Sequence, residues 1–521
     1  MTSRSEMSNC GSASDQAAVL TFLGSHSSAV KRIDTHASIV FLEPDRVLKI
    51  KRAVRLQFLD YSSLARRKRA CEDELAINKR HAPSLYRRVV PITLDDNRIE
   101  IDGHGVPVEW AVEMARFDEK KTLDHLSAAG DIAPELADQL ADVMLASHQD
   151  AEVSDGSTWL SSISAIINRN TQKFRGQKAL AGDAVERLHL LSHQQHAEHL
   201  DLLQQRAAHR LVRRCHGDAH LGNIVLIEAE PVLFDAIEFD PVIATVDVLY
   251  DLAFTMMDFI YFDQRVAANR LFNRYLQQTW PENGHALRLL PLFQSIRAAV
   301  RSHVLFTKHE QSSDDDSAVV KAKAYFDLAL RLIAPTAPSL IAVGGRSGTG
   351  KTVLCRSLAG LIEPSPGAVL LRSDVVRKGL FGANEFASLP ETGYAPEVSK
   401  RVYHTMVSRA HEIIDQGFSV VLDAAFLDAA ERDAVSIAAH ESGVNFRPLF
   451  LTADPGTRLK RIAGRKHDAS DATPEVAAYQ EQLDIGHLTW STIDASGSPE
   501  QTLHLAAANL GCLIPRESKT S

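Results

Sequence analysis

The pattern of apolar and polar positions gives the chain a β-rich beginning, a long helical middle and a last part in which strands and helices alternate. Near the N-terminus, two β-rich runs at 33–42 and 46–51 flank a Glu-Pro-Asp turn, which predicts a hairpin. Residues 64–81 have the apolar spacing of a helix. Residues 108–117 alternate as a strand does.

Residues 122–214 follow helical spacing, and the run 215–240 then places two short strands around a turn. Further helices extend to residue 333, and the two prolines in 334–338 predict a stiff linker. Beyond the linker, four buried-strand runs alternate with helical segments; they lie at 339–343, 368–371, 418–422 and 446–451. Such alternation predicts a parallel sheet. We therefore expect two domains, residues 1–335 and 336–521.

Composition narrows the class of protein. A chain of 521 residues with 45% hydrophobic content can bury more than one core. Its net charge of -9 argues against nucleic acid as a general partner. The five cysteines are scattered without a C-x-x-C pair, which indicates a reducing compartment and no zinc site. No apolar run reaches the roughly 18 residues of a membrane span, so we expect a cytoplasmic protein without a membrane partner. The sequence leaves the oligomeric state open.

The run 215–240 carries the residues that phosphoryl transfer requires. This reaction needs a carboxylate near the acceptor hydroxyl and oxygen ligands for the metal that neutralises the phosphates. Asp218 is the candidate acceptor of the hydroxyl proton. Asn223 and Asp235 are the candidate Mg²⁺ ligands.

The sequence H-G-D-x-x-x-x-N followed by this second aspartate resembles the catalytic and metal-binding loops of the aminoglycoside phosphotransferase family. The resemblance implies a protein-kinase-like domain that binds ATP, with an N-lobe at about 17–117 and a C-lobe at about 118–335. It also implies that Asp251 braces the catalytic loop.

A kinase-like N-lobe uses a strand lysine to hold the α- and β-phosphates and a helix glutamate to position that lysine. Lys49 matches the family's lysine, and Lys51 on the same strand face is the alternative. Glu74 matches the glutamate, and Glu72 is the alternative. The family's glycine-rich loop is missing, and residues 35–38 stand in its place.

The family's name is a poor guide to the acceptor. In this family, helices corresponding to residues 255–310 wall the acceptor pocket, and here they carry more basic than acidic residues. A polycationic aminoglycoside would need an acid-rich pocket. We therefore expect a neutral or anionic small molecule with a hydroxyl group.

A second nucleotide motif follows the linker. Residues 344–352 read G-G-R-S-G-T-G-K-T between a buried strand and a helix, which is the G-x-x-x-x-G-K-T phosphate-binding loop. Its backbone amides wrap phosphates at a helix N-terminus, its lysine reaches the β- and γ-phosphates, and its threonine ligates Mg²⁺. The predicted ATP-binding residues are Gly345, Ser347, Gly348, Thr349, Gly350, Lys351 and Thr352.

The segment around this motif resembles small-molecule P-loop kinases, including gluconate-kinase-like and zeta-toxin-like proteins with an AAA-type ATP-binding domain. The resemblance implies that Asp374 lies beside the acceptor hydroxyl with Arg377 near the substrate. It implies that Arg461 and Arg465 clamp the transferring phosphate from a lid. Asp423 is either a water-mediated Mg²⁺ ligand or the polar end of a core strand.

Together these features predict a mixed α/β and α+β protein, in which a two-lobed kinase-like domain precedes a P-loop parallel-sheet domain. The predicted function is a bifunctional ATP- and Mg²⁺-dependent phosphotransferase acting on small-molecule hydroxyls. In one alternative, a nucleotide-sensing domain regulates a single kinase domain. In another, the P-loop half is a polynucleotide 5′-hydroxyl kinase, although it has few aromatic residues for stacking bases.

Overall fold

The computed structural model describes residues 13–26, 29–35, 37–56, 59–130, 132–311, 316–464 and 469–511. The chain forms two compact units. The first contains 1–131, 143–161 and 204–252, and the second contains 132–142, 162–203 and 253–521. The domain boundary at residue 335 stays a prediction. In the described part of the chain, no helix combines the length and the apolar character needed to cross a membrane.

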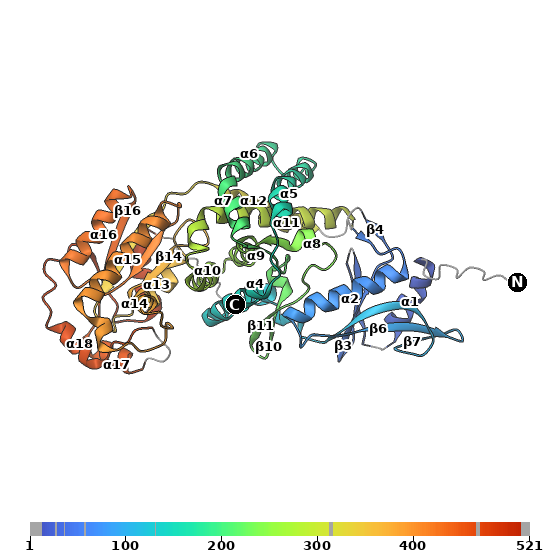
Figure 1. Ribbon diagram of the computed structural model, residues 1–521, viewed down its shortest axis with the longest axis horizontal. Coiled ribbons are helices and arrows are strands. Elements are labelled where there is room, and N and C mark those ends of the chain that lie inside the picture. Colours follow the sequence, from blue (N-terminus) through green and yellow to red (C-terminus); the bar gives the residue numbers. More distant parts are fainter. Residues whose placement is uncertain are drawn as a thin grey trace. The chain divides into compact units, whose positions relative to one another are not determined.

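The first unit begins with an antiparallel six-stranded sheet whose strand order is β1-β2-β3-β8-β6-β7 (Figure 1). The strands are β1 (Lys31–Asp34), β2 (Ser38–Leu42), β3 (Arg46–Lys51), β6 (Tyr86–Asp95), β7 (Arg98–Ile101) and β8 (Val106–Ala115). Their inward side chains, among them Phe41, Leu48, Ile50, Val90 and Ala111, form an apolar core. The predicted hairpin is β2 and β3, and the first predicted run is split into β1 and β2.

Helix α2 (Leu64–His81) packs on this sheet, and α1 (Ala13–Ser25) contacts β8 (Figure 1). A fully buried ion pair fixes the rotation of α2, because Nε of Arg67 lies 2.8 Å from Oε2 of Glu109 on β8. Gln16 donates a hydrogen bond of 2.7 Å to the same oxygen. A buried charge pair with such bonds tolerates little change in geometry. The helix therefore presents one defined face to β3.

The remainder of the first unit is built from short elements around the run 215–240. They are β4 (Arg55–Leu56), β5 (Leu59–Asp60), η1 (Glu119–Lys121), α3 (Leu123–Ala129), β9 (Val212–Arg214), η2 (Leu221–Asn223), β10 (Ile224–Ile227), β11 (Glu230–Leu233), α8 (Pro241–Ala244) and β12 (Thr245–Asp247). Strands β10 and β11 form the predicted hairpin. Four helices contribute residues to both units: α4 (Pro134–Asp150), α5 (Ser157–Arg175), α7 (Leu200–Ala208) and α9 (Val248–Tyr261).

The second unit contains a parallel five-stranded sheet with the order β14-β15-β13-β16-β17. Its strands are β13 (Ser339–Gly345), β14 (Val369–Arg372), β15 (Val420–Asp423), β16 (Asn445–Thr452) and β17 (Ser491–Asp494). The four predicted strand runs correspond to β13 to β16. Since β13, β14 and β15 end at the same edge, the residues after them meet there.

Helices cover both faces of this sheet (Figure 1). The helices that contact its strands are α13 (Lys351–Ala359), α14 (Ser373–Leu380), α15 (Pro396–Ile414), α16 (Ala429–Glu441) and α19 (Pro499–Leu510). The same part of the chain also forms η4 (Glu391–Tyr394), α17 (Pro455–Ala463) and α18 (Pro474–Glu481). The same unit includes α6 (Gly182–Glu198), α10 (Arg265–Thr279), η3 (Gly284–Leu289), α11 (Leu290–Gln311) and α12 (Asp316–Ile333). The fold class predicted from the sequence is confirmed.

Candidate active sites

The strand lysine and the helix glutamate of the N-lobe lie in direct contact. Nζ of Lys49 on β3 is 2.7 Å from Oε1 of Glu74 on α2 and 2.5 Å from Oδ1 of Asp235. The alternative glutamate, Glu72, is about half exposed and pairs with Lys68 on the helix surface. Of the two glutamates considered, only Glu74 faces the lysines in the described structure.

Both lysines of β3 contact Glu74. Lys51 Nζ lies 2.8 Å from Oε2 of Glu74 and also pairs with Glu238. Burial by itself would lower the pKa of Lys49, but Asp235 and Glu74 outweigh burial and raise that pKa well above its ordinary value. The pKa of Lys51 is raised in the same way by Glu74 and Glu238. Both side chains are therefore charged at neutral pH.

The catalytic-loop candidates also lie together. Nδ2 of Asn223 donates hydrogen bonds of 3.0 Å to Oδ2 and to the backbone oxygen of Asp218. These bonds orient the amide nitrogen toward Asp218, so that Oδ1 of Asn223 is the atom available to a cation. The backbone N–H of Phe234 donates to the Asn223 carbonyl at 3.0 Å, which brings the following residue, Asp235, to the same loop.

Asp251 braces this loop, as the family resemblance implies. Its Oδ1 accepts a hydrogen bond of 2.9 Å from the N–H of Gly217, and its Oδ2 lies 3.3 Å from Nε2 of His148. Asp251 and His148 are buried. Cys215 lies beside them, with the three ligand-type atoms within 4.8 Å of one another. The carboxylate of Asp251 is thus engaged from two sides behind the catalytic loop.

The loop that carries Asp235 is held by α2. Nδ2 of Asn78 donates to the Ala236 carbonyl at 3.3 Å, and the Ala236 N–H donates to Oδ1 of Asn78 at 2.7 Å. Asp235 has a positive φ of 60°. A non-glycine residue in this region is uncommon and is retained where surrounding bonds fix it. Asn78 lies one turn after Glu74, so a single face of α2 positions both the lysines and the Asp235 loop.

Residues 35–38 stand where the family resemblance implies a glycine-rich loop. The turn at 35–38 is closed by Thr35, whose hydroxyl accepts a hydrogen bond of 3.0 Å from the Ser38 N–H; His36 lies outside the described residues.

Three of the basic residues in 255–310 are paired with acids. Arg270 pairs with Asp138 and Arg274 pairs with Asp142, while Arg265 pairs with Glu363. These three cations are therefore partly neutralised within the protein.

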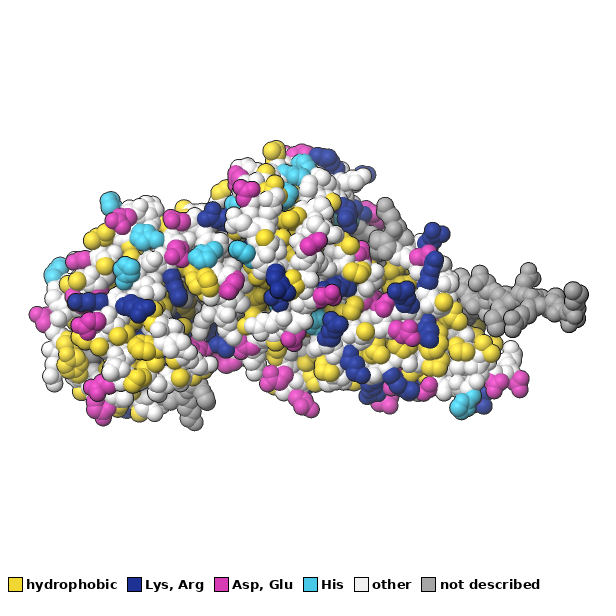
Figure 2. All heavy atoms as spheres, in the orientation of Figure 1, with side chains coloured by type: hydrophobic (Ala, Val, Ile, Leu, Met, Phe, Trp, Pro, Cys, Tyr) yellow, Lys and Arg dark blue, Asp and Glu magenta, His cyan; other side chains and the backbone are white. Residues whose placement is uncertain are grey.

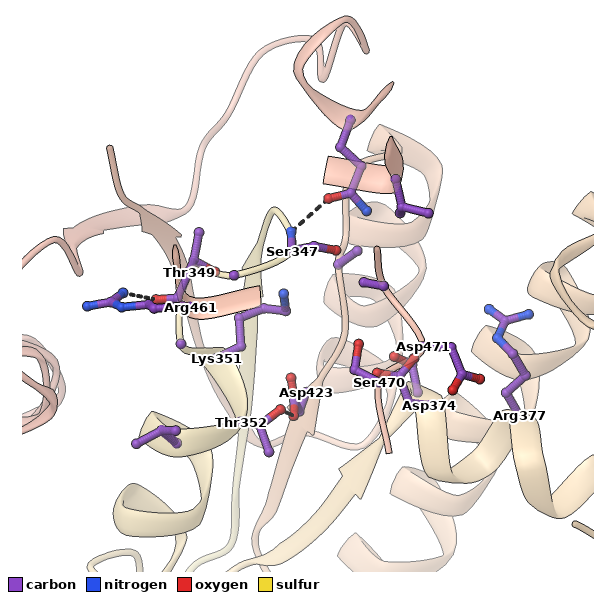
Figure 3. Close-up of a pocket in the computed structure, with 18 of the residues that line it drawn as sticks. Ser347, Thr349, Lys351, Thr352, Asp374, Arg377, Asp423, Arg461, Ser470 and Asp471 are labelled. Atoms are coloured by element: carbon purple, nitrogen blue, oxygen red, sulfur yellow. Dashed lines mark hydrogen bonds between the residues drawn. The ribbon is translucent and has the colours of Figure 1, made fainter. Parts of the chain in front are cut away.

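The P-loop connects β13 to α13 and borders a cavity of about 760 Å³ (Figure 3). Gly345, Gly348 and Gly350 have positive φ values of 140°, 82° and 95°. At Gly345, a Cβ atom would lie 2.6 Å from the Leu451 carbonyl oxygen, so the close approach of the loop to β16 requires glycine there. The side chains of Lys351 and Thr352 line the cavity, as do Ser347 and Thr349.

Thr352 and Asp423 meet beneath the loop. The Thr352 hydroxyl donates a hydrogen bond of 2.6 Å to Oδ2 of Asp423 at the end of β15 (Figure 3). Arg372 Nε lies 3.6 Å from the same oxygen. Hydroxyl and carboxylate oxygens are the ligands that Mg²⁺ prefers. Thr352 and Asp423 therefore fit a magnesium site in the P-loop unit, as Asn223 and Asp235 do in the first unit.

Asp374 lines the same cavity as Lys351 and Thr352. It belongs to the first turn of α14, directly after β14, and Figure 3 places it across the cavity from Lys351. Burial raises the pKa of the Asp374 carboxyl, and the nearby carboxylate of Asp423 raises it further. A carboxyl with a raised pKa in a pocket is a good candidate for general base catalysis.

Arg377 and its neighbours form the wall beyond Asp374. The Arg377 guanidinium donates to the Gly393 carbonyl at 2.8 Å and lies over the Tyr394 ring. The Tyr394 hydroxyl donates to Asp471, and Lys378 lies 3.3 Å from Asp471. Sequence reasoning missed Tyr394 and Asp471, because they come from segments distant in the chain.

Of the two predicted lid arginines, only Arg461 is described, and Arg465 lies outside the described residues. Arg461 donates to the carbonyls of Thr349, Ala495 and Gly497 at 3.3, 2.8 and 2.8 Å. Figure 3 shows its guanidinium directed away from Asp374. In this arrangement Arg461 holds the P-loop against the segment after β17, and its clamping role stays a prediction.

Gln480 on α18 is a further residue that the sequence did not suggest. Its Oε1 accepts a hydrogen bond of 2.7 Å from the N–H of Ser347 in the P-loop (Figure 3). A P-loop amide of this kind donates to phosphate when a nucleotide is bound. Gln480 therefore accepts the hydrogen bond that a phosphate oxygen of a bound nucleotide would accept.

Residues 340–484 match a family model described as an AAA domain. An uncharacterised protein of Mycobacterium tuberculosis is 28% identical to this chain over 491 residues, which cover 90% of this chain and 93% of that protein. A gluconokinase structure from Sinorhizobium meliloti has 18% identity and a TM-score of 0.25, covering 33% of this chain and 92% of its own. A choline/ethanolamine kinase family structure from Mesorhizobium loti has 13% identity and a TM-score of 0.37, covering 61% of this chain and 99% of its own.

The AAA match covers the P-loop, Asp374 and, apart from Ser339, strands β13 to β16 of the parallel sheet, and it ends before β17. In the first unit, the sheet, the contact of Lys49 with Glu74 and the loop of Asp218 and Asn223 have the arrangement that the other resemblance implied. These findings support phosphotransferase activity in general terms. Residues 340–484 are therefore similar to AAA domains, and they contain the P-loop.

Proposed function

We propose that the chain is a bifunctional phosphotransferase that moves the γ-phosphate of ATP to hydroxyl groups of small molecules at two separate sites. In the first unit, Asp218 accepts the proton of the acceptor hydroxyl while Lys49, positioned by Glu74, holds the α- and β-phosphates. Asn223 and Asp235 are the residues that would hold Mg²⁺. When bound, Mg²⁺ neutralises charge on the phosphates.

In the second unit, Asp374 accepts the proton of a different acceptor, while Lys351 and the amides of the P-loop hold the phosphates. At both sites, the acceptor oxygen forms a bond to the γ-phosphorus as the bond between that phosphorus and the β,γ-bridging oxygen breaks. ADP leaves with that oxygen, and the hydroxyl proton goes to the carboxylate. Thr352 and Asp423 would hold the second Mg²⁺.

The observation that carries the proposal is the placement of Asp374, with its raised pKa, across one cavity from Lys351 and Thr352. The contact of Asp218 with Asn223 supports the same chemistry at the first site. Figure 2 gives no reason to favour a polynucleotide acceptor, because acidic and basic side chains of the described residues are interspersed on the face that it shows. Small molecules are therefore the acceptor class that we propose.

The test is a screen of hydroxyl-bearing metabolites for ATP consumption by the full-length protein, with Asp218→Ala, Lys351→Ala and the double variant. We expect each single substitution to remove one activity and to leave the other. If turnover of one acceptor instead survives each single substitution and is lost only in the double variant, the two sites share that acceptor. If no variant differs from the parent in turnover of any acceptor, the proposal is wrong.

The same variants address the regulatory alternative. If the P-loop site senses nucleotide, ATP bound there will change turnover at Asp218 without being hydrolysed, and Lys351→Ala will remove that change. Trapping labelled phosphate on the acceptor separates transfer from sensing. Transfer that depends on Lys351 contradicts a purely sensory role.

A further inference from the structure

Strand β14 lies at the edge of the parallel sheet, where half of its backbone groups lack a neighbouring strand. Val369 bonds toward β15, since its N–H donates to the Ser419 carbonyl at 2.9 Å. The backbone N–H and C=O groups of Ala368 and Leu370 therefore point away from β15, because successive residues of a strand bond to opposite sides. Exposed edge groups of this kind invite pairing with other chains unless something covers them.

Helix α10 covers this edge with two asparagines one turn apart. Nδ2 of Asn269 and Nδ2 of Asn273 donate to the Ala368 carbonyl at 3.0 and 3.1 Å. Oδ1 of Asn273 accepts from the Leu370 N–H at 2.7 Å. Asn269 is buried, and its Oδ1 accepts a 3.0 Å bond from Asn273. The two side chains thus form a connected pair that replaces a neighbouring strand.

The contact between the helices and the P-loop fold is close enough to need small residues. A Cβ atom on Gly360 would lie 2.9 Å from Cα of Val266 in α10, and one on Gly367 would lie 2.5 Å from Nδ2 of Asn269. Gln416 adds two buried bonds to η3, one to the Gly284 carbonyl at 2.7 Å and one from the Leu287 N–H at 2.9 Å. The sheet and these helices therefore form one packed body.

The end of β14 reaches the P-loop site. Two residues beyond Leu370, Arg372 contacts Asp423, which in turn bonds Thr352. Asp374 follows in the first turn of α14. Any displacement of β14 is therefore passed to Arg372 and Asp374 over a short, extended stretch of chain.

We propose that Asn273 is a positioning residue of the P-loop site, which holds β14 where Arg372 and Asp374 can face the phosphate loop. The helices between 253 and 333 then belong to the P-loop enzyme as well as to the kinase-like fold. The expected change in ATP turnover rests on the proposed function of Asp374. The expected change in hydrogen exchange does not depend on that function.

The experiment compares Asn273→Leu, which removes both bonds to β14 and keeps the branched shape of the side chain, with Asn273→Asp, which keeps only the acceptor for the Leu370 N–H. Gln278→Ala is the control, because Gln278 lies on the same helix and bonds Asp142 instead of the sheet. All three are made in the full chain carrying Asp218→Ala, so that turnover reports the P-loop site alone. Hydrogen exchange of the 368–374 peptide is measured beside ATP turnover.

We expect Asn273→Leu to speed exchange of this peptide at least about tenfold, since two hydrogen bonds are lost. We expect it to lower kcat about tenfold with the KM for ATP little changed, and Asn273→Asp to retain part of kcat. Unchanged exchange in Asn273→Leu would overturn the proposal, as would faster exchange with unchanged kcat. If the parent phosphorylates no acceptor, the proposed function fails. Hydrogen exchange at 372–374 with nucleotide bound then tests the positioning role: faster exchange in Asn273→Leu than in the parent supports it, and equal exchange overturns it.

Discussion

Oε2 of Glu74 lies 2.8 Å from Nζ of Lys51, although the lysine that contacts Asp235 is Lys49. One buried carboxylate therefore serves two cations. The cations differ in access, because the Lys49 side chain is 13% exposed and the Lys51 side chain only 2%. Lys51 is closed off further by Glu238. We infer that Lys49 is the lysine open to a nucleotide and that Lys51 holds Glu74 from behind.

This difference predicts distinct effects of two substitutions. Lys51→Met leaves Glu74 and Glu238 without a shared cation, so it should lower the free energy of unfolding by about 3 kcal/mol. Lys49→Met should abolish most Asp218-dependent turnover while costing less stability, because Lys49 is the more exposed of the two. Denaturant unfolding and ATP turnover of the full chain measure both effects.

The control for this comparison is Arg69→Ala. Arg69 is 84% exposed and reaches Asp73 only at 3.9 Å, so its removal should change stability by less than about 0.5 kcal/mol. If Lys51→Met is as stable as this control, the ion pairs of Lys51 with Glu74 and Glu238 do not contribute the stability that we expect.

Local sequence was sufficient for some of these features. The P-loop and the pair Asp218 and Asn223 were predictable, because the residues of each lie within a few positions of one another in the sequence. The choice between Glu74 and Glu72 was not, because it depends on the rotation of α2, which Arg67 and Glu109 set over a long separation in sequence. Gln480, at the P-loop, and Asn273, at the edge of β14, are invisible in the sequence for the same reason.

The raised pKa of Asp374 predicts the pH dependence of the P-loop activity. As a proton acceptor, Asp374 must be ionised, so turnover should fall on acidification with a midpoint above the ordinary carboxyl value of about 4. Asp423→Asn removes a neighbouring negative charge and should move that midpoint to lower pH. The measurement is the midpoint of kcat against pH in the Asp218→Ala background, since the amplitude will also fall. A midpoint that moves upward contradicts this assignment.

Glu431, at the start of α16, predicts a pH dependence of stability. Burial raises its pKa to about 7 from 4.5, although Tyr403 donates to it. A group with a raised folded-state pKa contributes stability below the unfolded pKa, and this contribution is lost as the pH rises through about 7. Glu431→Gln should therefore raise the free energy of unfolding by about 1 kcal/mol at pH 8.5, allowing for partial exposure, and by much less at pH 5. Asp433→Asn, on the exposed side of the helix, should act equally at both values.

The bond between Gln480 and Ser347 predicts that a substitution can tighten nucleotide binding. In Gln480→Ala, the Ser347 N–H loses its internal acceptor, so phosphate no longer competes with Gln480. We expect the Kd for ATP at the P-loop to fall about fivefold, the equivalent of one hydrogen bond of about 1 kcal/mol. Calorimetric titration in a Lys49→Met background measures this site. Tyr479→Ala, which alters an exposed neighbour on α18, should leave the Kd unchanged, and weaker binding in Gln480→Ala would show that Gln480 assists the nucleotide.

Gly348 allows the effect of a close contact to be separated from that of backbone conformation. Its φ is 82°, and a Cβ atom there would lie 2.6 Å from the carbonyl oxygen of Arg458 in α17. Gly417 has the same φ of 82°, but a Cβ atom there would meet nothing within 4 Å. Both alanine substitutions should cost about 1 kcal/mol of stability for the left-handed conformation. Only Gly348→Ala must also push the P-loop away from α17, so its Kd for ATP at this site should rise at least about tenfold while Gly417→Ala binds as the parent does. Equal affinities in the two variants would mean that the loop can move without affecting phosphate binding.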